Sequence, residues 1–160
     1  MWFRGDKAKR DNPLAAFPPV PCIEEAVALV AQQRGRKIKL LPWDLGPGTL
    51  SGLWVVCESV DYIVHPADAL PTRRTAIIAH ELAHMLLNHE PQSSVRGAEQ
   101  IAKALAPTLD SRVARRLLAR HAEDSPDEAA AERLGTEILA RLSLAASSSP
   151  QDPMLGRLLA

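Results

Sequence analysis

The sequence His-Glu-Leu-Ala-His, from His80 to His84, limits the possible folds more than any other part of the chain. It lies between Thr-Ala-Ile-Ile-Ala and Met-Leu-Leu, an apolar setting that favours a buried helix. Histidines four residues apart lie on one face of an α-helix, so both imidazoles can reach a single metal ion. The intervening Glu81 then lies beside the open coordination position, which is the arrangement of zinc proteases.

The apolar surroundings make a metal-free interpretation of this helix costly. Each buried polar group without a partner costs roughly 1 to 3 kcal/mol. A bound zinc ion offsets that cost for the two imidazoles. The alternative is a pair of core histidines joined by hydrogen bonds, with Glu81 facing water.

Two histidines do not complete a tetrahedral protein site, so a third ligand has to come from elsewhere in the chain. A metzincin would carry glycine at position 87 and histidine at position 90, and this chain has Leu87 and Glu90 there. The other common solution is a glutamate from a later helix. Such a helix is predicted to begin near residue 125, and Glu128 and Glu132 stand one turn apart on it.

Small residues share the helix face of Glu128, because Ala131 and Gly135 follow it by three and seven positions. This face can approach the histidine-bearing helix closely. Alternatively, Ser125 and Glu128 form a capping box that only closes the helix N-terminus. The residues alone leave Glu128, Glu132 or neither as the ligand. If Glu128 binds the metal, the Glu132 carboxylate can accept a hydrogen bond from the N–H of a ligating imidazole and so orient that ring.

The remaining pattern predicts an α+β fold, with a small antiparallel sheet of about three strands packed on a helical zincin-like core. The metal-binding helix should run from Pro71 or Thr72 to about Asn88. Pro42 should end the first strand, and a turn is expected near Ser59 and Asp61. Strands are predicted at residues 37–41, 53–57 and 62–65, and helices at residues 23–33, 98–105, 110–121 and 125–142.

Length and composition agree with one compact domain, since the chain has 160 residues and 46% hydrophobic content. We expect an extended N-terminal lead-in over residues 1–21, a single metallopeptidase-like domain over residues 22–146, and a flexible C-terminal tail over residues 147–160. Lys and Arg total 19 and Asp and Glu total 19, so the surplus positive charge that direct nucleic-acid binding normally uses is missing. We expect no direct nucleic-acid binding.

The same sequence favours a cytoplasmic location. Cys22 and Cys57 form no CxxC pair and suit a reducing compartment. The N-terminus has no continuous apolar segment of the kind that signal peptides carry. No stretch reaches the roughly 18 to 20 apolar residues that a membrane span needs, so we expect no membrane association.

The motif also predicts a mechanism. Zinc with three protein ligands lowers the pKa of its bound water towards about 7 and polarises a substrate carbonyl. Glu81 would take the proton of the attacking water and later deliver it to the leaving amine. A donor to the tetrahedral oxyanion is also expected. By residue type, the candidates for that donor are Tyr62, His65, His89 and His121.

HELAH, preceded by TRRTAIIA and followed downstream by EAAAERLGTEIL, resembles the ImmA/IrrE (DUF955) metallopeptidases, whose pattern runs HExxH and later ExxADxFAAELL. The resemblance covers roughly residues 23 to 142. It implies that the zinc ligands are His80, His84 and Glu128. It further implies that Glu81 is the catalytic base and that Glu132 occupies the family's aspartate position.

The resemblance also implies a substrate. Members of this family typically cut a partner transcriptional repressor of the helix-turn-helix type, in a stress response or in the transfer of a mobile element. The expected function is therefore a zinc-dependent endopeptidase of the HExxH gluzincin type acting on such a repressor, or the enzymatic half of a toxin–antitoxin pair. The competing hypothesis is a non-catalytic regulatory or toxin–antitoxin binding module with a structural metal site.

Overall fold

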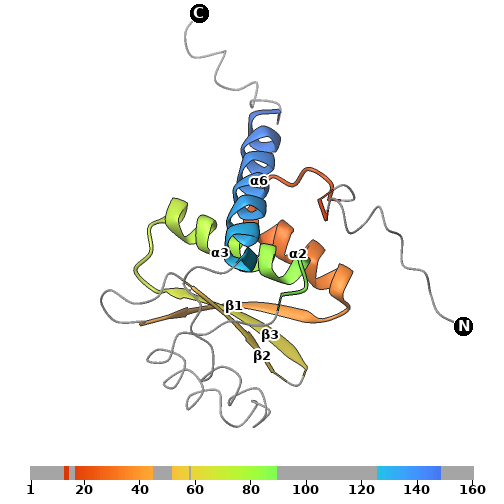
Figure 1. Cartoon of the computed structure of the whole chain (residues 1–160). Coiled ribbons are helices and arrows are strands. Elements are labelled where there is room, and N and C mark those ends of the chain that lie inside the picture. The colour runs from red at the N-terminus through yellow and green to blue at the C-terminus, as the bar shows by residue number, and fades with distance from the viewer. Residues whose placement is uncertain (1–12, 15–16, 45–51, 58, 90–125, 149–160) are drawn as a thin grey trace, which may run out of the picture.

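The computed structural model describes residues 13–14, 17–44, 52–57, 59–89 and 126–148 (Figure 1). Its elements are α2 (Ile23–Arg34), β1 (Lys37–Trp43), β2 (Leu53–Val56), β3 (Val60–Pro66), α3 (Pro71–Leu86) and α6 (Pro126–Ser148). These helices and this small sheet confirm the α+β class. The helices expected at residues 98–105 and 110–121, as well as Ser125 and His121, lie outside the described residues.

Helix α2 forms where the apolar residues recur with helical spacing. Ile23, Ala26, Val27 and Val30 are its buried face. The helix ends at Gly35, whose φ of 64° lies in the left-handed region that glycine adopts without steric cost. This stop directs the chain into β1.

The three-stranded sheet has the order β1-β3-β2, with β3 at its centre. Strand β2 pairs with β3 in antiparallel register, as expected, with Leu53 opposite Val64. Strand β1 pairs with β3 in parallel, with Lys37 opposite Val60, so the prediction of an entirely antiparallel sheet is wrong for this pair. The alternation of residues along a strand predicts which face is buried, but it does not specify the direction of the neighbouring strand.

Two further expectations about the strands are corrected by the structure. Strand β1 continues through Pro42 to Trp43, which is possible because β1 is an edge strand and can accommodate a residue without an N–H. Asp61 belongs to β3 rather than to a turn, and it is fully buried. Its carboxylate accepts hydrogen bonds from Arg36 Nε at 2.9 Å and Trp54 Nε1 at 3.2 Å, which compensate its burial.

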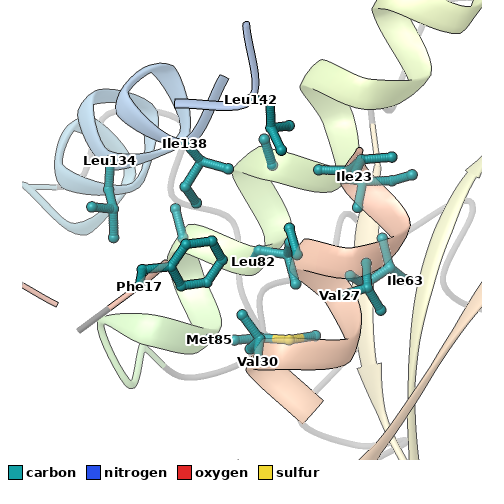
Figure 2. Close-up of a cluster of buried hydrophobic side chains, with 14 of the residues drawn as sticks. Phe17, Ile23, Val27, Val30, Ile63, Leu82, Met85, Leu134, Ile138 and Leu142 are labelled. Carbon is teal, nitrogen blue, oxygen red and sulfur yellow. The ribbon is translucent and has the colours of Figure 1, made fainter. Parts of the chain in front are cut away.

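The main core lies between the helices and one face of the sheet. Figure 1 shows α2 and α3 on the same face, with α6 packed against α3. Figure 2 shows the side chains that fill the space between these elements: Ile23, Val27 and Val30 from α2, Leu82 and Met85 from α3, Leu134, Ile138 and Leu142 from α6, Ile63 from β3, and Phe17. The predicted apolar stripe of α6 is thus confirmed.

Residues from the expected lead-in also contribute to this core. Leu14 is fully buried, and Phe17 and Val20 are each 6% exposed. The Arg141 side chain of α6 holds this segment by donating to the Leu14 carbonyl at 2.8 Å. At the other end, α6 continues to Ser148, two residues into the segment expected as a tail.

A second cluster covers the opposite face of the sheet and contains Leu53, Val55, Cys57 and Val64. Cys57 is buried and Cys22 is half-buried, and no disulfide joins them. Among the described residues, no helix has the length and apolar character that crossing a membrane requires.

Candidate metal centre

The two histidines of the HELAH sequence lie on one face of α3, as their spacing predicts. Their Nε2 atoms are 3.0 Å apart, and the rings meet edge to face with centroids 4.7 Å apart. His84 is buried, whereas the His80 side chain is 26% exposed. The pair therefore directs two nitrogen atoms toward one point at the surface of the core.

Glu128, in the first turn of α6, brings a carboxylate to the same point. Its Oε1 lies 2.8 Å from His80 Nε2 and its Oε2 lies 3.4 Å from His84 Nε2. The possible ligand atoms of His80, His84 and Glu128 all lie within 4.8 Å of one another. This group could hold a metal ion.

The chemistry of the three groups fits a cation. A neutral imidazole whose proton is on Nδ1 presents a lone pair at Nε2, and a carboxylate presents only lone pairs. Lone pairs that converge from three side chains repel one another unless a proton or a cation lies among them. Imidazole and carboxylate ligands suit zinc and several other divalent metals, so the donor set alone does not identify the metal.

Glu132, the other carboxylate considered, is directed elsewhere. It lies one turn further along α6 with its side chain exposed to solvent. Its backbone carbonyl accepts a hydrogen bond from Thr136 Oγ1 at 2.9 Å within the helix. This position supports neither binding of the metal by Glu132 nor a hydrogen bond from a ligating imidazole to its carboxylate.

The small residues of α6 set the distance between the two helices. Ala131 is fully buried, and a Cβ at Gly135 would lie 3.2 Å from His80 Cα and 3.3 Å from the His80 backbone nitrogen. The backbone of α6 thus runs directly over that of α3. The expectation that this face permits close approach is confirmed, and the approach brings Glu128 within reach of the imidazoles.

Glu81 faces the interior beside the start of β2. A Cβ at Gly52 would overlap Ile77 Cγ2 and would lie 3.2 Å from Glu81 Oε1. Glycine at position 52 therefore lets the chain pass close to the Glu81 carboxylate. The sequence does not single out Gly52, because its close contact is with Glu81, which is distant from it in the chain.

Burial changes the acid–base properties of this site. Burial, and then the negative charge of Glu128, raise the pKa of Glu81 to about 8, while the Trp54 backbone N–H acts in the opposite direction. Burial, and then the charges of His80 and His89, lower the pKa of His84 to about 4. His84 is therefore neutral at pH 7 and can offer a lone pair. A divalent cation in the group would favour the ionised form of Glu81.

The four residues considered as oxyanion donors lie in different parts of the chain. His65 is buried on β3, with its Nδ1 3.1 Å from the Pro66 carbonyl oxygen. Tyr62 packs with the cluster on the sheet face opposite the helices. His121 lies outside the described residues. His89 contacts His84, with 3.0 Å between their Nδ1 atoms.

Comparison of the chain with protein-family models, curated proteins and solved structures found no match.

Proposed function

We propose that this protein is a zinc-dependent endopeptidase of the HExxH type, with His80, His84 and Glu128 as the zinc ligands. The observation that carries the proposal is the position of Glu128. Its Oε1 lies 2.8 Å from His80 Nε2, although the two residues are far apart in the sequence. A zinc site with three protein ligands requires a third donor beside the two HExxH histidines, and here a separate helix supplies it.

The number of protein donors favours a catalytic over a structural site. Structural zinc sites are closed by four protein ligands, whereas catalytic sites have three and leave one position for water or substrate. Within the described part of the chain, the group contains three donors. When bound there, zinc would supply Lewis-acid polarisation of a carbonyl and acidify water.

Glu81 is the proposed general base. It follows His80 directly on α3, and its side chain is buried with 7% exposure. In this role it accepts a proton from the attacking water and passes it to the leaving amine. Its burial also keeps bulk water away, which strengthens its electrostatic interactions with substrate.

The proposed substrate is a helix-turn-helix transcriptional repressor, and the proposed setting is the cytoplasm. The substrate comes from the resemblance of HELAH and the later glutamate helix to ImmA/IrrE metallopeptidases, whereas the setting comes from the cysteine pattern and from the lack of a continuous apolar segment near the N-terminus. Membership of that family is part of the proposal. The equal numbers of acidic and basic residues support a protein that acts on a regulator rather than on DNA itself.

The test is the Glu81→Gln variant beside the wild type, both loaded with zinc. Cleavage of a proteome-derived peptide library is followed by mass spectrometry, and zinc content is measured by metal analysis. Removing a general base typically costs about 10² to 10⁴ in rate. We expect the variant to lose cleavage by at least about 100-fold while keeping its zinc.

A result in which both proteins bind zinc and neither cleaves any peptide or helix-turn-helix repressor supports the competing hypothesis of a non-catalytic module with a structural metal. Equal cleavage by both proteins would show that Glu81 is not the base. Glu132→Gln serves as the matched control, because it changes an exposed carboxylate on α6.

A further inference from the structure

His89 and Asp127 flank the metal-ligand group without belonging to it. The His89 Nδ1 atom lies 3.0 Å from His84 Nδ1, and His89 Nε2 lies 3.7 Å from Asp127 Oδ1. We propose that His89, supported by Asp127, is a positioning residue that holds His84 in the orientation and tautomer required to bind the metal through Nε2. This inference rests on the proposed metal site.

The end of α3 explains how His89 reaches His84. Asn88 has φ 54°, in the left-handed region that asparagine tolerates better than most residues. The Asn88 N–H donates to Met85 O at 3.2 Å and the His89 N–H donates to His84 O at 3.0 Å. This pair of bonds is a Schellman motif, which turns the chain back over the last helical turn. It places the His89 ring beside the His84 ring, with centroids 5.2 Å apart.

Arg34 anchors the same turn from α2. Its Nη1 donates to the Met85 carbonyl oxygen at 2.7 Å, a group that also accepts from Asn88. The position of His89 is thus determined by the helix end, and its ring is not free to swing into solvent: the side chain is 11% exposed.

The direction of the hydrogen bonds follows from the ligand role of His84. If His84 Nε2 carries the lone pair for the metal, its proton is on Nδ1, and Nδ1–H donates to His89 Nδ1. His89 Nδ1 is then an acceptor, so its own proton is on Nε2, the atom that faces Asp127. This arrangement makes the hydrogen bond between the two imidazoles with both rings neutral, while Asp127, 3.7 Å from His89 Nε2, lies beyond hydrogen-bond distance and acts on His89 through its charge. Such outer partners fix ring orientation and increase the basicity of the ligand.

Asp127 should contribute less than His89. Its carboxylate is 3.7 Å from His89 Nε2 and its side chain is 60% exposed, so solvent screens the interaction. It nevertheless directly precedes Glu128 in α6. The first turn of α6 therefore carries both the proposed ligand, Glu128, and Asp127, which supports His89.

The experiment compares His89→Leu, His89→Gln and Asp127→Asn with the wild type. Zinc affinity is measured by competition with a chromophoric chelator, and the His89 tautomer by ¹⁵N NMR. Leucine removes the acceptor, whereas the glutamine side-chain carbonyl can still accept from His84 Nδ1–H. We expect about 10- to 100-fold weaker zinc binding in His89→Leu, the range for lost outer-shell partners. We also expect recovery of most of this loss in His89→Gln, and a smaller effect in Asp127→Asn.

Circular dichroism and urea unfolding of the metal-free proteins separate positioning from folding. Wild-type NMR should show the His89 proton on Nε2. The positioning role of His89 is overturned if the wild type binds zinc and His89→Leu binds it with the same affinity. It is also overturned if His89→Gln weakens zinc binding as much as His89→Leu, or if the His89 proton is on Nδ1. A wild type that binds no zinc overturns the proposed function as well, so the two failures are distinguishable.

Discussion

Gly135 of α6 lies directly against the backbone of His80, because a Cβ at position 135 would come within 3.2 Å of His80 Cα. The atoms that such a Cβ would meet, His80 Cα, His80 N and Ala79 C, belong to the backbone of α3 rather than to flexible side-chain ends. The separation of the two helices is therefore limited by backbone contact. That separation also determines how far Glu128 is from the imidazoles.

Gly135→Ala should push α6 away from α3 and weaken metal binding. Overpacking typically lowers the free energy of unfolding by about 1 to 3 kcal/mol. The better helix propensity of alanine raises it by up to about 1 kcal/mol. We expect a small net loss in the free energy of unfolding, and a fall in zinc affinity of about tenfold, or 1.4 kcal/mol. Urea unfolding and chelator competition measure the two effects. Thr136→Ala, at the exposed neighbouring position, is the control. Unchanged zinc affinity in Gly135→Ala would contradict this account of the helix contact.

Glu128→Gln and Glu132→Gln make a matched pair of carboxylate changes one turn apart on α6. Glu128→Gln should weaken zinc binding by more than the ~100-fold that outer-shell changes reach, because it removes a charged ligand. Glu132→Gln should bind zinc like the wild type, since its side chain is exposed. Metal analysis after dialysis and a competition titration test both. Comparable losses in the two variants would mean that α6 docks differently from the arrangement described above.

The stability of the metal-free protein should fall as pH rises from about 6.5 to about 8. The raised pKa of Glu81 means that the folded state holds a proton which the unfolded state has released. Folding is thus penalised increasingly between the usual pKa of 4.5 and about 8. The lowered pKa of His84 has the opposite effect, a loss of stability as pH falls from 6.5 to about 4. Above pH 6.5 the Glu81 effect therefore acts without opposition from His84.

Glu81→Gln removes this penalty, so the metal-free variant should show a smaller decline from pH 6.5 to 8 and should be more stable than the wild type at pH 8. Each pKa unit corresponds to about 1.4 kcal/mol, so the difference at pH 8 should be on the order of a few kcal/mol. Urea unfolding at pH 5, 6.5 and 8 in the presence of a chelator measures it. Parallel curves for the two proteins would argue against a buried, protonated Glu81.

Asp61→Ala should destabilise the junction between α2 and the sheet. The Asp61 carboxylate is fully buried and lies 2.8 Å from Arg36 Nη2. Removing one partner of a buried ion pair costs about 3 to 5 kcal/mol, although Arg36 is 31% exposed and can recover some hydration, so the lower end is expected. Thermal unfolding monitored by circular dichroism gives the change. Asp68→Ala, an exposed change in the turn after β3, should leave stability nearly unaltered. Equal effects of the two changes would refute the structural role of Asp61.

Local patterns in the chain were sufficient for several features of the site. The period of the α-helix alone places His80 and His84 on one face. The same period puts Ala131 and Gly135 beneath Glu128, and it predicts the buried stripe of α6. These features depend only on the helix repeat, which is set by hydrogen bonds between residues four apart.

Long-range packing selected among alternatives that the local patterns left open. Glu128 and Glu132 are both carboxylates near the start of α6, and the way α6 docks on α3 brings Glu128 to the imidazoles and leaves Glu132 in solvent. The parallel pairing of β1 with β3, the burial of Asp61 in β3 and the contact of His89 with His84 depend likewise on distant partners or on a turn at a helix end. A residue pattern along one element carries the period of that element, whereas the choice of partner comes from side-chain packing between elements, which no single segment contains.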